Sequence, residues 1–172
     1  MDGSTTRRGH KCWYQVEEVG LAAINDAMMI KNGIYYLLKK YFKNKEYYQD
    51  VVDLFHEVSF ITTLGQLQDI KTSQKMDLNL FTMERYKSIV ANKTAYYSFF
   101  LPVALAMHMA GFGKDPEVFR QAKTILLEIG NFFQVQDDFI DCFGDSAVTG
   151  KIGTDIMDGK CSWLAVVALQ VR

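Results

Sequence analysis

The 172-residue sequence has little proline and cysteine, and it contains no long hydrophobic run. Its 2 prolines and 12 glycines exclude collagen-like and proline-rich architectures. Its three cysteines are odd in number and far apart, which excludes a disulfide scaffold and favours a reducing compartment. The longest apolar candidate, residues 99–110, is interrupted by Pro102 and His108, so no segment reaches the length that a membrane-spanning helix needs.

An excess of charge is also lacking, because the formal net charge is −1. The sequence therefore lacks the broad positive surface of a nucleic-acid-binding protein, and no nucleic-acid partner is expected. The polar N-terminal residues contain no apolar core like that of a secretory signal. The three histidines are scattered, so a zinc site is not indicated. We expect a cytoplasmic protein, while a mitochondrial or peroxisomal form stays open.

Apolar residues make up 49% of the sequence, which is enough for one domain with a core. They recur every three or four residues along most of the chain, as in amphipathic helices. Strand signals are weak, so the fold class is all-α, with antiparallel helices joined by short loops. Two helix starts have capping residues, at Asp115–Pro116 and at Thr82 or Asn79. Helices are expected over residues 19–38, 50–68, 82–90, 93–110, 116–143 and from about 160 to 172.

The most informative stretch is acidic, QVQDDFID at residues 134–141. Asp137 and Asp138 lie four and three residues before Asp141, which predicts three carboxylates on one helix face with Gln134 one turn earlier. Like charges at this spacing repel, and negative charge is disfavoured towards the C-terminal end of a helix. Mg²⁺ would compensate, because its usual ligands are carboxylate oxygens, waters and substrate phosphates. The alternative is an acidic helix face exposed to solvent.

A phosphate ligand also needs cations, and the sequence offers several candidates that are weak individually. Arginine and lysine bind phosphate oxygens, yet each candidate could equally be a surface charge or part of a helix cap. Taken with the acidic helix and the apolar interior, the set suggests a metal-bridged phosphate ligand with an apolar tail. The candidates are Arg7, Arg8, Lys93, Thr94, Lys151 and Lys160, with Gln66 and Asp69 on one side of a helix.

Several segments together match the motifs of a known family. They are DDFID at 137–141, FGD at 143–145, TGKIGTDI at 149–156, KCSWL at 160–164, MDGSTTRRG at 1–9, GQ with Asp69 from 65, RYKSIV at 85–90 and KTAYYSF at 93–99. This set resembles the trans-isoprenyl diphosphate synthases, and most closely their eukaryotic farnesyl diphosphate synthase branch. The segment at 137–141 looks like the second aspartate-rich motif of that family.

The resemblance implies an isoprenoid synthase-type helical bundle around a central cavity. It implies a prenyltransferase that condenses dimethylallyl or geranyl diphosphate with isopentenyl diphosphate to a short product, expected to be farnesyl diphosphate. Several Mg²⁺ ions would assist the departure of the diphosphate, and the protein would be a homodimer.

The resemblance also implies roles for individual residues. The metal ligands would be Asp2, Asp137, Asp138 and Asp141. The diphosphate groups would be bound by Arg7, Arg8, Lys93, Lys151, Lys160 and Gln66. The residues acting in catalysis would be Lys93, Thr94, Gln134 and Lys151.

The family's first aspartate-rich motif has the form DDxxD, and Asp2 matches only its last position. We therefore expect residues 1–172 to be a single polyprenyl synthetase domain that is incomplete at both ends, with little or no activity alone. Two alternatives stay open. One is a terpene synthase derived from this family, and the other is a non-catalytic helical partner of an active synthase.

Overall fold

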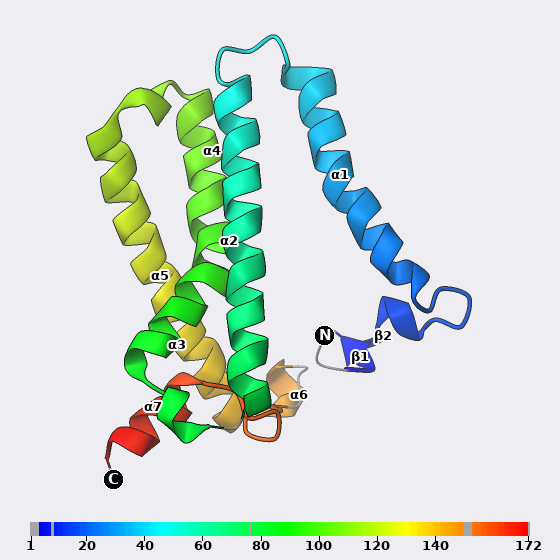
Figure 1. Ribbon diagram of the computed structural model, residues 1–172, viewed down its shortest axis with the longest axis vertical. Coiled ribbons are helices and arrows are strands. Elements are labelled where there is room, and N and C mark those ends of the chain that lie inside the picture. Colours follow the sequence, from blue (N-terminus) through cyan, green and yellow to red (C-terminus); the bar gives the residue numbers. More distant parts are fainter. Residues whose placement is uncertain (1–3, 8, 76, 150–152, 172) are drawn as a thin grey trace. The chain divides into compact units, whose positions relative to one another are not determined.

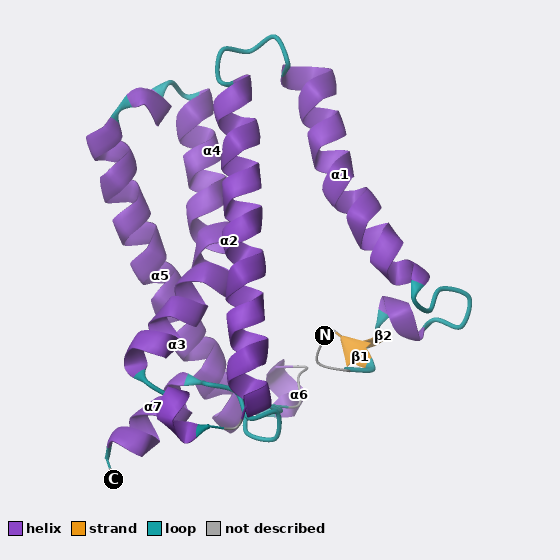
Figure 2. Cartoon of the chain, in the orientation of Figure 1, coloured by secondary structure: helices purple, strands orange, loops and turns teal. Residues whose placement is uncertain are grey.

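The computed structural model describes residues 4–7, 9–75, 77–149 and 153–171. Figure 2 shows that helices dominate them, which confirms the all-α class. No helix in these ranges is both long and apolar enough to cross a membrane. The α-helices are α1 (Ala22–Phe42), α2 (Tyr48–Lys75), α3 (Met83–Val90), α4 (Leu101–Met109), α5 (Pro116–Phe143), α6 (Ser146–Thr149) and α7 (Trp163–Gln170). A π-helix, η3 (Ala91–Phe100), and the short 3-10 helices η1 (Trp13–Gln15), η2 (Leu78–Leu80) and η4 (Phe112–Lys114) complete the helical elements.

The chain divides into two compact units, the first ending at Val52 and the second beginning at Asp53. The first unit contains a short hairpin of β1 (Thr6–Arg7) and β2 (His10–Lys11), followed by η1 and α1. The side chain of Trp13 donates a hydrogen bond of 2.7 Å to Asp26 on α1. The hairpin is a difference from the purely helical expectation, because its strands are too short to give an alternating apolar pattern. That the chain forms one domain stays a prediction.

Two helix starts were predicted correctly from their capping residues. Asp115 accepts hydrogen bonds from the backbone of Glu117 and Val118, and Pro116 occupies the first turn of α5. Thr82 accepts a bond from the backbone of Arg85 at the start of α3. These side chains satisfy backbone N–H groups that have no partner within the helix.

The structure corrects two expected helix starts and contains one helix that was not expected. The helix expected to start at Lys93 has no separate start, because Ala91 is already helical and η3 continues directly from α3. Lys93 and Thr94 therefore lie inside a helical run and do not cap one. The last helix begins at Trp163, later than expected, because Ser162 caps it by accepting a bond from Ala165. The short helix α6 was not predicted.

Two apolar clusters form the core of the second unit. One joins α3 to α7, which lie side by side at one end of α5 in Figure 1. The other joins α2, η3 and α4, with partly buried residues of α5 packed against it. In this second cluster Phe100 meets Phe119 edge to face, with ring centroids 5.6 Å apart. The buried members are Phe81, Tyr86, Ile89, Val90, Cys161 and Val166 in the first cluster, and Leu54, Val58, Phe100 and Ala104 in the second.

The π-helix η3 is held between α2 and α5 by very close backbone contacts. A Cβ atom on Gly65 of α2 would lie 2.6 Å from the backbone carbon of Asn92. A Cβ atom on Gly130 of α5 would lie 2.8 Å from the Cα of Ala95, which is completely buried. Both positions therefore require glycine. Since π-helical turns are rare and often occur at functional sites, η3 is a candidate location for one.

Replacing Gly130 by alanine is expected to destabilise the protein. The added methyl group would push η3 away from α5, and overpacking of this kind costs about 1–3 kcal/mol. Chemical denaturation monitored by circular dichroism measures the loss. Gly33→Ala in α1 is the matched control, because nothing lies within 4 Å of its added carbon. That substitution is expected to stabilise by roughly 0.5–1 kcal/mol, since glycine is unfavourable inside a helix. Equal effects of the two substitutions would contradict the packing argument.

Candidate functional site

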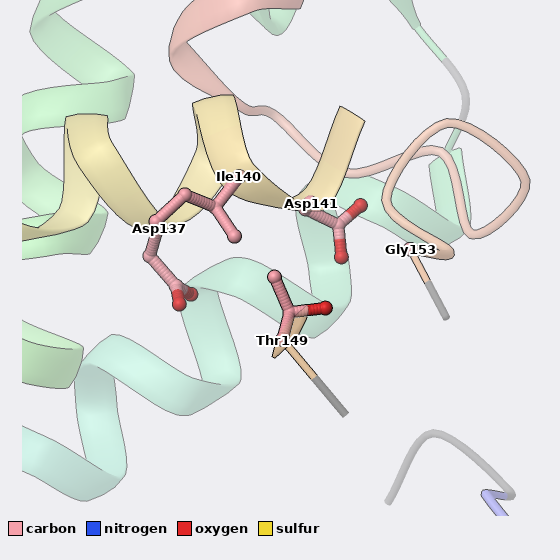
Figure 3. Close-up of a pocket in the computed structure, with 5 residues that line it drawn as sticks. All are labelled: Asp137, Ile140, Asp141, Thr149 and Gly153. Carbon is pink, nitrogen blue, oxygen red and sulfur yellow. The ribbon is translucent and has the colours of Figure 1, made fainter. Parts of the chain in front are cut away.

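Two carboxylates near the C-terminal end of α5 open onto one small pocket. Asp137 and Asp141 line it together with Ile140 of the same helix, and Thr149 and Gly153 line it from the following segment. Figure 3 shows the three α5 side chains projecting from the same side of the helix. This is the arrangement that their spacing predicted, since residues three and four apart share a helix face.

Asp138 has a different environment from the other two carboxylates. It is buried, and its Oδ1 accepts a hydrogen bond of 2.9 Å from Gln134. Its Oδ2 accepts a bond of 2.7 Å from the backbone of Trp163, at the start of α7. Successive helix residues point about 100° apart, so Asp138 turns into the protein while Asp137 lines the pocket. In the part of the chain that the structure describes, no three His, Cys, Asp or Glu side chains are arranged to hold a metal ion, so the predicted convergence of three carboxylates is not seen.

The environment of Asp138 also includes the buried Tyr86. Burial raises the pKa of Asp138, while the bonds from Gln134 and Trp163 act in the opposite direction. The Tyr86 hydroxyl faces this carboxylate without reaching hydrogen-bond geometry. Burial first, and then the negative charge of Asp138, raise the pKa of Tyr86 above its ordinary value. Asp138 therefore serves as an anchor that ties α5 to α7 and orients Gln134.

Asp155 adds a fourth carboxylate that was not among the predicted site residues. Its backbone N–H donates a bond of 3.0 Å to Oδ2 of Asp141. Burial, followed by the charges of Asp141 and Asp138, raises the pKa of Asp155 to about 6. The same loop runs so close to α5 that a Cβ atom on Gly153 would lie 2.9 Å from Oδ2 of Asp141. The signal for Asp155 was present in the segment TGKIGTDI, but its contact with Asp141 cannot be read from sequence spacing.

A short hydrogen-bond chain connects η3 to the carboxylates. Thr94 donates its hydroxyl hydrogen to Oε1 of Gln134 at 3.2 Å. The amide nitrogen of Gln134 then donates to Asp138, with a longer contact of 3.4 Å to Asp137. Because all these bonds agree on the direction of the amide, Gln134 is fixed in one orientation. The structure thus brings together the predicted residues Thr94, Gln134, Asp137 and Asp138.

Two of the predicted lysines, Lys93 and Lys160, also come together, around a carboxylate outside the predicted site set. The ammonium groups of Lys93 and Lys160 lie 2.7 Å and 3.0 Å from Oδ2 of Asp69 on α2. Gln66, three residues earlier on α2, is partly exposed. The sequence spacing predicts that Gln66 and Asp69 share one side of a helix, but it assigns no role to Asp69.

The structure does not place the remaining predicted residues beside the acidic pocket or the lysines at Asp69. Asp2, Arg8 and Lys151 lie outside the described residues. Arg7 is exposed on β1 in the first unit, whereas the acidic end of α5 belongs to the second. Their assignment stays a prediction.

The fold and the site together define a class of protein. A model of the polyprenyl synthetase family matches residues 1–172, and the chain belongs to that family. A solved structure of farnesyl diphosphate synthase from T. brucei, complexed with risedronate, is similar with a TM-score of 0.85 and 36% sequence identity. The similarity covers 98% of this chain and 51% of that chain.

Curated relatives are similar over the same extent. The chain is 54% identical to farnesyl pyrophosphate synthase of Saccharomyces cerevisiae, over 99% of this chain and 49% of the yeast protein. It is 55% identical to farnesyl pyrophosphate synthase of Homo sapiens, over 99% of this chain and 41% of the human protein. The chain thus spans about half the length of the curated relatives it matches.

The raised pKa of Asp155 predicts a specific pH dependence of stability. The folded state disfavours the charged form of Asp155. The contribution of this group to the stability of the folded state is therefore fully present below pH 3.8 and is lost as the pH rises through about 6. Asp155→Asn is therefore expected to raise the melting temperature at pH 8 without divalent cations, with a gain that shrinks towards pH 4. Differential scanning calorimetry across this range measures it. Glu128→Gln, an exposed carboxylate on α5, is the control, and an equal gain from both variants would refute the prediction.

Proposed function

We propose that this chain is part of a prenyltransferase that condenses dimethylallyl or geranyl diphosphate with isopentenyl diphosphate, with farnesyl diphosphate as the product. The observation that carries the proposal is the pairing of an acidic pocket with two lysines in one helical unit. The chain from Thr94 through Gln134 to the carboxylates connects them. The names of the relatives support the choice of product, and the substrates follow from the family resemblance.

The described residues fit a Mg²⁺ requirement. Asp137 and Asp141 present hard oxygen donors to one pocket, and Mg²⁺ is commonly held by one or two carboxylates together with waters and substrate phosphates. Burial and then the charges of Asp141 and Asp138 raise the pKa of Asp155, although Lys160 acts in the opposite direction, so carboxylates are crowded here. Asp137 and Asp141 would hold the ion, with Asp2 as a further ligand from outside the described residues. When bound, Mg²⁺ would stabilise the negative charge that develops on the departing diphosphate.

The protein groups would bind the substrate and stabilise charge. Lys93 and Lys160 would bind phosphate oxygens. These interactions would strengthen when the carbon–oxygen bond of the allylic diphosphate breaks and negative charge develops on the diphosphate. Thr94 uses its hydrogen on Gln134, so its oxygen lone pairs and the backbone carbonyl of Lys93 are suited to face the allylic cation. The double bond of isopentenyl diphosphate then attacks that cation, and loss of a proton completes the condensation. Arg7, Arg8, Lys151 and Gln66 would contribute further diphosphate contacts.

Oligomeric state and location follow from the family resemblance. We expect a homodimer in the cytoplasm. Among the described residues Cys12, Cys142 and Cys161 are free thiols, in keeping with a reducing compartment. Sedimentation of the purified protein and fluorescence microscopy of a tagged copy measure these two properties.

In the direct test, these 172 residues replace the matching segment of farnesyl pyrophosphate synthase from Saccharomyces cerevisiae, which gives a chimaera. The chimaera is expected to convert dimethylallyl and isopentenyl diphosphates into farnesyl diphosphate. Asp137→Asn is expected to lower its kcat by roughly 100-fold or more, because a ligand of the catalytic ion is lost. Product formation is followed by liquid chromatography with radiolabelled isopentenyl diphosphate.

The matched control is Glu128→Gln, which removes an exposed carboxylate two turns earlier on α5 and should leave turnover unchanged. Near-normal turnover of the Asp137→Asn chimaera would refute the metal assignment. A chimaera that releases cyclised or hydrolysed products from farnesyl diphosphate alone would identify a terpene synthase. An inert but well-folded chimaera would favour the non-catalytic partner.

A further inference from the structure

One buried carboxylate on α2 holds two lysines that are distant in the sequence. Oδ2 of Asp69 accepts a hydrogen bond of 2.7 Å from the Lys93 ammonium group, 24 residues away. The same oxygen accepts a bond of 3.0 Å from Lys160, 91 residues away. The Asp69 side chain is only 6% exposed, whereas those of Lys93 and Lys160 are 33% and 17% exposed. The carboxylate is therefore internal, and both cations lie nearer to solvent.

Both ammonium groups of this cluster share a single carboxylate oxygen. Because a lysine ammonium has three N–H donors, each lysine has donors beyond the one that bonds Asp69. Burial alone would raise the pKa of Asp69, but the hydrogen bonds and charges of Lys93 and Lys160 outweigh it and hold the pKa below its usual value. Asp69 is therefore ionised at neutral pH. Without its charge, two neighbouring ammonium groups would repel and separate.

The backbone places Asp69 where it can reach both lysines. Gly65 lies one helical turn before Asp69, on the same face of α2, and allows the backbones of α2 and η3 to meet next to Lys93. Lys93 is followed by Thr94, whose bond to Gln134 leads to the carboxylates of α5. Lys160 is also close enough to lower the pKa of Asp155. Lys93 is therefore linked, through Thr94 and Gln134, to Asp138 and Asp137 of α5.

We propose that Asp69 is a positioning residue that holds Lys93 and Lys160 side by side as a paired cation site for one diphosphate group. The inference rests on the proposed function, because it takes the two lysines as ligands of that group. Asp69 itself does not contact the substrate. Its carboxylate draws the two ammonium groups together before the ligand arrives, so binding need not overcome their repulsion or order two flexible side chains.

A different result is expected if Asp69 serves only to stabilise the fold. In that case the loss of Asp69 would lower stability and would change diphosphate affinity only to the extent that the fold is lost. The matched control is Thr72→Val, less than one turn further along α2. Thr72 is buried, and its hydroxyl donates a bond of 2.7 Å to the backbone oxygen of Gln68. Its loss would destabilise the same helix without touching either lysine.

The test measures binding of inorganic diphosphate in the presence of Mg²⁺ to the 172-residue chain by isothermal titration calorimetry. Asp69→Asn is expected to raise the Kd about tenfold or more, the range for losing a charge-assisted interaction. Asp69→Glu keeps the charge on a longer arm, so its Kd should rise by about two- to fivefold. Thr72→Val should leave the Kd within about twofold, even where its melting temperature falls. Circular dichroism verifies that each variant is folded.

An unchanged Kd for Asp69→Asn would overturn the proposal, and so would an equal loss of affinity in Thr72→Val. If Asp69→Asn does not fold, the Asp69→Glu variant decides, and an unchanged Kd for it overturns the proposal. Absence of diphosphate binding by the unmodified chain also overturns it. Binding with the expected order of Kd values, combined with an inert yeast chimaera, would refute the proposed reaction and leave the role of Asp69 standing. In an active chimaera, Asp69→Asn should raise the KM for the allylic substrate more than it lowers kcat.

Discussion

The close contact of η3 with its two neighbouring helices is the constraint on which the site depends. Gly65 on α2 and Gly130 on α5 each meet the backbone of η3 at distances that exclude any side chain. These contacts place Lys93 and Thr94 within reach of polar groups on α2 and α5. A side chain at either glycine would move η3 outward, and the hydrogen bonds that join the lysines to the acidic helix would lengthen.

The buried carboxylate of Asp138 accepts a hydrogen bond at each of its two oxygens. Asp138 uses one oxygen for Gln134 and the other for the start of α7, so it connects the last helix to α5. Such a network is favourable only when its members are paired, because an unpaired buried polar group is costly. The pairing of Asp138 leaves Asp137 and Asp141 as the carboxylates that open onto the pocket. Asp138 thus has a structural role, whereas Asp137 and Asp141 line the pocket.

Local signals in the sequence predicted much of this fold. The bounds of α5 agree with the structure because Asp115 and Pro116 determine where it begins and Gly144 follows its last residue. The π-helix was not predictable, because its apolar spacing resembles that of an α-helix and its backbone is determined by packing. The start of α7 was missed because the cap at Ser162 stands in a segment whose composition already looked helical.

The candidate site was predictable only where its residues are neighbours in the sequence. Spacing placed Asp137 and Asp141 on one face, and the pocket agrees. Spacing could not show that Asp138 turns inward, because that depends on the position of α7. The lysine cluster depends on contacts over 24 and 91 residues, so no local pattern identifies Asp69 as its centre.

We propose that the lysines and the acidic pocket form two sides of one diphosphate site. A crystal structure of this chain with Mg²⁺ and inorganic diphosphate tests it most directly. The account predicts phosphate oxygens within hydrogen-bond distance of the Lys93 and Lys160 ammonium groups, and Mg²⁺ between the diphosphate and Asp137. Diphosphate bound elsewhere, with Asp69 still holding both lysines and no metal at Asp137, would contradict it.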